Sequence, residues 1–116
     1  MIDSTPRFLQ GVFGFQGAGY DSPALLSTAL VYTVPADKRA QLIYLRGGNS
    51  ASDLVFFALM QNGKPMRLFP VAAGGACHVP LAVVEDLPPE TVIEVFVGAP
   101  EGVSGTAIVD IGIVEI

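Results

Sequence analysis

The sequence predicts an all-β fold: an antiparallel β-sandwich of the jelly-roll kind, with about eight short strands and no significant helix. Thirteen glycines and nine prolines cut the 116 residues into short pieces. Those pieces are rich in Val, Ile, Leu, Thr, Phe and Tyr, which are typical of strands. No stretch of roughly 11–18 residues has the periodicity of an amphipathic helix.

Eight strands are expected, each ended by a connection that contains residues typical of turns. Pro35 ends the second strand because proline cannot donate to a β-ladder, and Asp37 suits the turn that follows. The main connections are Val34–Lys38, Gly47–Ser50, Asn62–Gly63, Glu85–Pro89 and Gly98–Gly105. The expected strands are Leu9–Phe15, Thr28–Val34, Ala40–Arg46, Leu54–Gln61, Met66–Phe69, His78–Val84, Thr91–Val97 and Thr106–Ile116.

The dipeptide Asn62–Gly63 is the most specific local signal. Both residues tolerate the positive φ angles of a two-residue type I′ hairpin turn, which fixes the register of the flanking strands. Pro65 then implies that the second strand of the hairpin is an edge strand, or that it is unpaired at that point. The expected pairs are Gln61 with Lys64, Met60 with Pro65, Leu59 with Met66, Phe57 with Leu68, and Phe56 with Phe69.

Three strand regions are apolar on both faces, whereas a strand with one face in water alternates apolar and polar residues. In the hairpin, one face has Phe57, Leu59, Met66 and Leu68, and the other has Phe56, Ala58, Met60, Pro65 and Phe69, with Arg67 as its charge. In the last strand, Val109, Ile111 and Ile113 oppose Ile108, Val114 and Ile116, which lie with Asp110. In Ala40–Arg46, the residues Ala40, Leu42 and Tyr44 oppose Gln41, Ile43 and Leu45.

Charge is scarce on this chain. Charged residues make up 15% of the sequence, against about 25% in ordinary globular domains. A folded monomer of 12.1 kDa exposes roughly 6,000 Å² of surface, which six basic and eleven acidic residues must keep in water. Strands with two apolar faces are central in a three-layer packing or covered by another chain, and 116 residues hardly supply a third layer. The sequence therefore favours subunit interfaces.

The first 27 residues differ from the rest because their aromatic side chains stand among glycines. A disordered tail is usually polar, so this segment is expected to be ordered. It is either a first strand and loop packed on its own domain, or an arm that docks on a neighbouring subunit. Residues 28–116 form the sandwich, and the whole chain is one domain. The expected interface residues are Phe8, Phe13, Phe15, Tyr20, Phe56, Met60, Phe69, Ile108, Val114 and Ile116.

No pattern predicts catalysis, a metal or a cofactor. His78 is the one histidine, so a metal site with two or three histidine ligands is excluded. A Ser-His or Cys-His arrangement likewise has no spare base. Cys77 precedes His78 on a predicted strand, so the two side chains should point to opposite faces. The acidic residues Glu85, Asp86 and Glu90 could hold calcium, but a solvated turn is favoured.

Other partners are disfavoured by charge and hydropathy. The net charge of −5 and the scattered basic residues argue against nucleic acid. No transmembrane helix is visible, because Leu68–Val84, the longest uncharged run, contains prolines and glycines. Asp3 and Pro6 precede any apolar run, so a secretory signal is not expected. The absence of Trp argues against sugar stacking, although the other aromatic residues could still line a lectin groove.

One stretch carries a family resemblance. Val31–Arg46, with the sequence VYTVPADKRAQLIYLR, resembles a YTVPAGK-A-L--I---N stretch of small β-sandwich structural proteins in the virions of tailed bacteriophages. A hydrophobic N-terminal segment precedes it, here Arg7–Leu30, and a strand and turn follow it, here Leu54–Pro70. A late L-P-G--I-V segment is similar to Leu87–Val95. The chain departs from the pattern at Asp37, where the family has glycine.

The resemblance implies a role that agrees with the charge deficit. It implies a non-enzymatic decoration (cement) protein of a bacteriophage capsid, which oligomerises, with a trimer expected, and bridges subunits of the major capsid protein. Such a protein would be made in the host cytoplasm and lie in the virion, on the outer surface of the capsid. The alternatives are a tail, connector or fibre component, or a carbohydrate-binding β-sandwich module.

Overall fold

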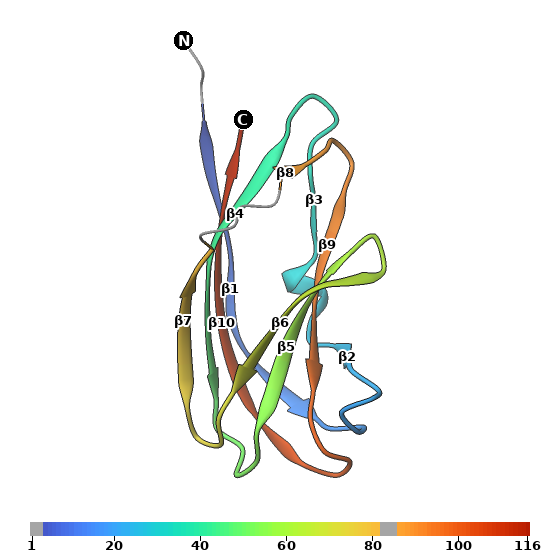
Figure 1. The fold of residues 1–116 in the computed structure, drawn as a ribbon, viewed down its shortest axis with the longest axis vertical. Helices are drawn as coiled ribbons and strands as arrows, with labels where there is room; N and C mark the ends of the chain where they lie inside the picture. The colour runs from blue at the N-terminus through green and yellow to red at the C-terminus, as the bar shows by residue number, and fades with distance from the viewer. Residues whose placement is uncertain (1–3, 82–85) are drawn as a thin grey trace.

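A computed structural model describes residues 4–81 and 86–116. The chain forms two five-stranded antiparallel sheets that pack as an elongated sandwich, 49 × 23 × 22 Å (Figure 1). The predicted all-β sandwich is confirmed. The elements are β1 (Thr5–Gln16), β2 (Ala24–Leu25), the 3-10 turn η1 (Thr28–Leu30), β3 (Tyr32–Thr33), β4 (Ala40–Asn49), β5 (Val55–Gln61), β6 (Lys64–Val71), β7 (Ala76–Pro80), β8 (Asp86–Leu87), β9 (Val92–Gly98) and β10 (Ser104–Glu115).

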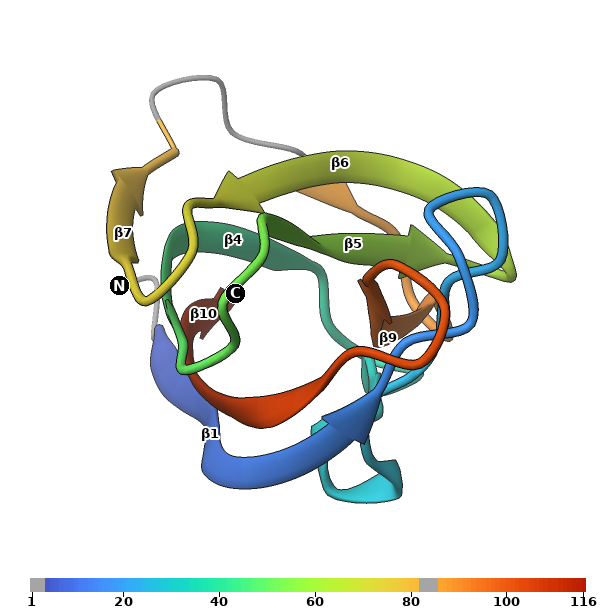
Figure 2. The same cartoon turned by 90° about the horizontal axis from the view of Figure 1, so that it is seen from below.

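The two sheets have separate strand orders. The first sheet runs β1-β10-β4-β7, with β8 also paired to β4, and the second runs β2-β9-β5-β6, with β3 also paired to β9. Strands β1 and β6 are therefore edge strands of different sheets, and in Figure 2 β6 runs along the top of the sandwich and β1 along its lower side. The edge position expected for the strand with Pro65 is confirmed.

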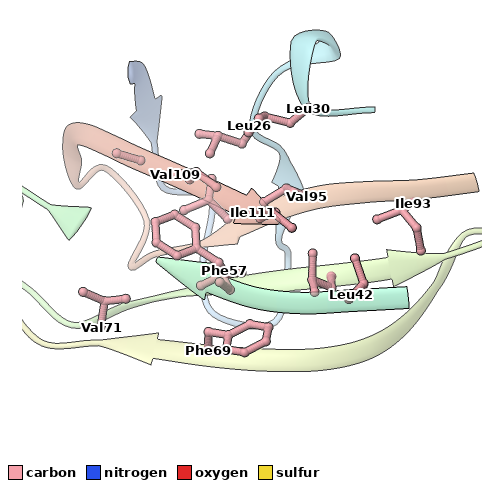
Figure 3. Packing of buried hydrophobic residues seen from close by; sticks show 14 of the residues in the cluster. Leu26, Leu30, Leu42, Phe57, Phe69, Val71, Ile93, Val95, Val109 and Ile111 are labelled. Atoms are coloured by element: carbon pink, nitrogen blue, oxygen red, sulfur yellow. The ribbon is translucent and has the colours of Figure 1, made fainter. Parts of the chain in front are cut away.

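The core lies between the sheets and is built from alternate residues of their long strands (Figure 3). Leu42 of β4, Phe57 of β5, Ile93 of β9 and Ile111 of β10 have almost no exposed surface. Burying one such side chain stabilises the fold by about 1.5–3 kcal/mol. Strands with this alternation are therefore more stable in the sandwich than in the unfolded chain.

The segment Thr28–Val34 was expected to be a strand, and this is wrong for its first half. A 3-10 turn forms over Thr28–Leu30, because the Ser27 Oγ accepts a hydrogen bond from the Ala29 N–H at 3.0 Å and caps the turn. Strand β3 then covers only Tyr32–Thr33. The strand expected over His78–Val84 starts earlier and ends at Pro80 in the structure, and Val84 lies outside the described residues.

The prediction of the hairpin turn is confirmed, but the predicted register beyond the turn is wrong. Asn62 and Gly63 have φ angles of 50° and 80°, and the pairs of Gln61 with Lys64 and Met60 with Pro65 are as expected. A bulge then shifts the register by one residue, which moves alternate side chains to the opposite face. The observed pairs that replace the expected ones are Leu59 with Arg67, Ala58 with Leu68, Phe57 with Phe69, and Phe56 with Pro70.

A second irregularity corrects the faces of Ala40–Arg46. Leu42 pairs with Ile113, but the next pair is Tyr44 with Gly112, so Ile43 is left out of the register. Tyr44 consequently does not share the core face with Leu42, and Leu45 is buried there instead.

The N-terminal segment packs on its own chain. Strand β1 pairs with β10 along its whole length, from Thr5 opposite Glu115 to Gln16 opposite Ser104. The following loop crosses to the second sheet, where the Gly19 N–H donates to the Ala99 carbonyl at 2.9 Å. In the single chain, this segment is therefore a first strand and loop packed on its own sandwich.

Candidate interaction surfaces

Large apolar side chains are exposed on both sheets of the sandwich. Val12 is 65% exposed, and Leu68 on the opposite sheet is 61% exposed. A soluble monomer rarely exposes large contiguous patches of such side chains. The exposed large hydrophobic residues among those described are Phe8, Val12, Tyr20, Leu25, Val31, Ile43, Leu54, Leu68, Ile108 and Ile116.

One patch lies over the second sheet and is called the Tyr20 patch. It surrounds a shallow hollow of about 290 Å³, and the lining residues are Tyr20, Leu54, Phe56, Leu68 and Pro70. No polar surface lines this hollow. Water in such a hollow finds no hydrogen-bond partner on the protein, so covering the hollow with another apolar surface is favourable.

The Tyr20 ring is fixed in place although it is exposed. Its hydroxyl donates to the Leu54 carbonyl at 2.6 Å, and its ring centroid lies 6.3 Å from that of Phe56. The loop that brings Tyr20 across needs glycine at position 17, because a Cβ there would lie 2.1 Å from the Pro100 carbonyl oxygen. A held aromatic ring loses little rotamer entropy on binding a partner.

A second surface, called the Val12 surface, lies on the outer face of the first sheet. Cross-strand pairing aligns Val12, Ile108, Gly48 and Ala76 in one row. Because the last two side chains are absent or small, the row forms a hollow of about 580 Å³ beside the larger ones. Most of its lining surface is apolar.

Polar side chains occupy the neighbouring position on the same face. The Tyr44 hydroxyl donates to the Asp110 carboxylate at 3.0 Å, and the Arg46 guanidinium lies 3.9 Å from that carboxylate and 5.1 Å from the Tyr44 ring. The pKa of Tyr44 is raised by desolvation and by the hydrogen bond to Asp110. The His78 ring meets the Tyr44 ring edge-on at 6.1 Å. These groups satisfy one another, which is typical of a surface network.

The expected interface residues fall into three groups. Phe8, Tyr20, Ile108 and Ile116 are exposed, and Phe13, Phe56 and Val114 are half-buried. Phe15, Met60 and Phe69 are buried, so the expectation that they lie on an open surface is wrong.

Each buried residue has its own cause. Phe15 is on the inward face of β1, and the bulge turns Phe69 into the core opposite Phe57. Met60 lies between two neighbouring strands, paired with Glu94 on one side and Pro65 on the other.

Sequence reasoning missed Val12, Leu54 and Leu68. Val12 could have been found, because it alternates with Phe8 and Gln10 on one face of β1. Leu68 could not, since its exposure depends on the bulge.

A buried carboxylate was also missed. Glu115 is 2% exposed, and it accepts hydrogen bonds from the Arg7 guanidinium at 3.3 Å and from the Tyr32 hydroxyl at 2.5 Å. Burial, and then the hydrogen bond to Glu115, raise the pKa of Tyr32. The three residues come from β10, β1 and β3, so the cluster ties the two terminal strands to the second sheet.

The side chains considered for catalysis or metal binding lie apart from one another. Cys77 packs towards the core while His78 is exposed on the other face, as predicted from their adjacency on a strand. Asp86 pairs with the Arg39 guanidinium at 2.8 Å, and Glu85 lies outside the described residues. Within residues 4–81 and 86–116, no three His, Cys, Asp or Glu side chains gather as metal ligands would, and no helix is long and apolar enough to cross a membrane.

Comparison with known proteins supports the fold. No family model and no curated protein matches the chain. The CBM36-1 domain of a multidomain xylanase from the hindgut metagenome of Trinervitermes trinervoides is similar in structure, with a TM-score of 0.57 and 14% identity over 95% of this chain and 96% of that one. A Bacillus endospore appendage pilus protein has a TM-score of 0.49 and 14% identity, over 95% of this chain and 88% of that one. A protein of infectious bursal disease virus has a TM-score of 0.44 and 12% identity, over 97% and 36%.

Proposed function

We propose that this chain is a non-enzymatic structural subunit of a tailed-bacteriophage virion, acting as a decoration protein on the outer surface of the capsid. Homo-oligomers would bind across neighbouring major capsid subunits and stabilise the shell. The observation that carries the proposal is the exposure of large apolar side chains on the outer faces of both sheets of a folded sandwich. The resemblance of Val31–Arg46 to virion proteins supports the same role.

Two apolar surfaces on opposite sheets suit a bridging protein. The Tyr20 patch and the Val12 surface face away from each other, so each can contact a different neighbour. A specific contact covers about 800 Å² on each partner. The chain exposes 6065 Å², so it has room for contacts with a capsid subunit and with a second copy.

The test uses undecorated heads of the phage that carries the gene. Purified protein is mixed with the heads, which are then sedimented, and bound protein is quantified on gels. We expect saturable binding at a copy number set by the capsid symmetry, heads that resist higher temperature, and no binding to unassembled capsid protein. Absence of binding to heads would overturn the proposal, and detection of the protein on tails by immunogold labelling would move it to the tail alternative.

Matched variants connect this test to the structure. Leu68→Lys puts a charge into the Tyr20 patch and should weaken head binding at least tenfold, because an unpaired charge would be buried in an apolar contact. Glu101→Lys, in an exposed turn outside the patch, is the control and should bind like wild type. Equal effects of the two variants would exclude the Tyr20 patch as the capsid contact.

A carbohydrate-binding module is the second candidate. The observation that favours it is the hollow of the Val12 surface, whose lining includes the polar side chains of Gln10, Arg46 and Asp110. A glycan array probed with the purified domain decides between the two. Binding to a defined glycan, lost in Asp110→Ala, would support this candidate.

A further inference from the structure

The outer edge of β1 has backbone groups with no backbone partner among the residues that the structure describes. The Gly17 N–H donates to the Val103 carbonyl at 2.6 Å, and the Ser50 N–H donates to the Thr106 carbonyl at 3.0 Å. Because hydrogen-bonded pairs alternate along antiparallel strands, odd-numbered residues of β1 bond to β10 and even-numbered ones face the open edge. The turn η1 lies beside β1, but no backbone hydrogen bond joins the two in the described structure. The residues that face the edge are Phe8, Gln10, Val12, Gly14 and Gln16.

From Phe8 onwards this edge lacks the sequence features that usually prevent strand addition, whereas Pro6 and Arg7 stand at its start. From Phe8 to Gln16 there is no charged residue, no proline and no bulge. Protected edges are short, bulged, or carry Lys or Pro. Strand β7, at the other edge of the same sheet, has only five residues and ends on Pro80. The contrast within one sheet indicates that the β1 edge is open to a partner strand.

Glycines in the strands of this chain are covered by aromatic rings from the opposite strand. A Cβ built on Gly98, Gly112 or Gly105 would lie 2.0, 2.1 or 2.9 Å from the ring of Phe56, Tyr44 or Phe15, which are the register partners of those glycines. Aromatic cover of a strand glycine stabilises pairing. Gly14 is the strand glycine with nothing within 4 Å of its Cβ position, and Phe8 on the same face is 56% exposed.

We propose that the β1 edge binds the same edge of a second copy, antiparallel, with Phe8 of each copy opposite Gly14 of the other. Gln10 then pairs with Val12 of the second copy, and the contact forms about eight backbone hydrogen bonds. The two first sheets become one continuous sheet. Such a contact is two-fold and closed, so it gives a dimer in place of the trimer that the family resemblance implies. The inference rests on the proposed function in treating the protein as homo-oligomeric.

The first test measures mass in solution by light scattering. Wild type should have twice the mass of one 12.1-kDa chain. Val12→Lys places a charge on the open edge and should be monomeric, whereas Leu68→Lys, an equally exposed position on the other sheet, should stay dimeric. A wild-type monomer at about 100 µM, where a micromolar complex would be formed, would overturn the pairing. A wild-type monomer that still binds phage heads would overturn the pairing and the homo-oligomer, and would leave the capsid-binding role of the proposed function standing.

The second test fixes the register by cross-linking. In a Cys77→Ser background, the double variant Phe8→Cys with Gly14→Cys should form disulfide-linked dimers with oxidised glutathione. Within one chain the two positions are about 20 Å apart, too far to bridge. Each single variant should stay unlinked, because neither position faces itself across the two-fold axis. Efficient linkage of a single variant, or none in the double variant, would overturn this register.

Discussion

Two edge strands on different sheets, β1 and β6, differ in how far they are protected against pairing with a further strand. Strand β6 begins with Lys64 and Pro65, carries Arg67 and Pro70, and has a bulge against β5. Strand β1 is longer, regular and uncharged from Phe8 onwards. Both leave one side without a neighbouring strand.

The difference teaches which edge the fold protects. On β6, the bulge turns Phe69 into the core, and charge and proline stand where another strand would pair. On β1, Phe8 and Val12 face outward beside unpaired backbone groups. Protection of one edge and not the other is expected if the open edge is covered in the working assembly.

The largest expected effect is on the free energy of unfolding, when one aromatic residue of each edge strand is replaced by alanine. Phe69→Ala should lower the free energy of unfolding by about 3–5 kcal/mol, because Phe69 is 5% exposed and its removal leaves a cavity. Phe8→Ala should change it by less than about 0.5 kcal/mol in the monomer, since that ring is exposed. Urea unfolding followed by circular dichroism measures both, with Phe8→Ala examined in the Val12→Lys background to remove dimer effects. Similar losses from both substitutions would mean that the edges do not differ in this way.

Phe69 also lies where the sequence no longer predicted the strand register. The turn at Asn62–Gly63 and the edge position of Pro65 could be predicted, because each depends on backbone properties of the residues themselves. The bulge depends on how β6 fits the finished core, which no local pattern encodes. Since strand side chains alternate with a period of two, this one-residue shift exchanged Phe69 and Leu68 between core and surface.

The sequence predicted that apolar side chains would be exposed, but it did not predict every residue or contact of the candidate surfaces. The charge deficit correctly indicated exposed apolar side chains, because strands that are apolar on both faces leave one set outside. The buried carboxylate of Glu115 was not predictable, since its partner Arg7 is 108 positions away in sequence. Such a contact follows from the pairing of the first and last strands, which a single sequence does not order.

The next effect distinguishes the two sides of β1 itself. Leu9→Pro removes an N–H that bonds to β10 and should cost about 2 kcal/mol more than Leu9→Ala, which removes only the side chain. Gln10→Pro removes an N–H at the open edge and should cost less than about 1 kcal/mol in the monomer, while abolishing the dimer. Denaturant unfolding and light scattering measure the two effects. A Gln10→Pro monomer as unstable as Leu9→Pro would assign the even-numbered residues to the β10 ladder.

The smallest effect separates the open edge of β1 from its anchored end, where Arg7 and Tyr32 hold Glu115. Tyr32→Phe leaves this buried carboxylate short of one donor and should cost about 1–2 kcal/mol at neutral pH, without changing the dimer. Burial and the bond to Glu115 raise the pKa of Tyr32 in the folded protein. The folded state therefore holds this proton more tightly than the unfolded chain, in which tyrosine titrates at a pH of about 10. The contribution of Tyr32 is complete below that pH and is lost as the pH rises further.

The cost of Tyr32→Phe should consequently shrink between about pH 10 and 12, measured as the difference in unfolding free energy between the two proteins. Val12→Lys is the reference background, because it keeps dimer dissociation out of the measurement. A cost that grows with pH would mean that Tyr32 titrates more readily in the folded protein. The hydroxyl would then not be the donor that holds Glu115, and the anchored end of β1 would depend on Arg7 alone.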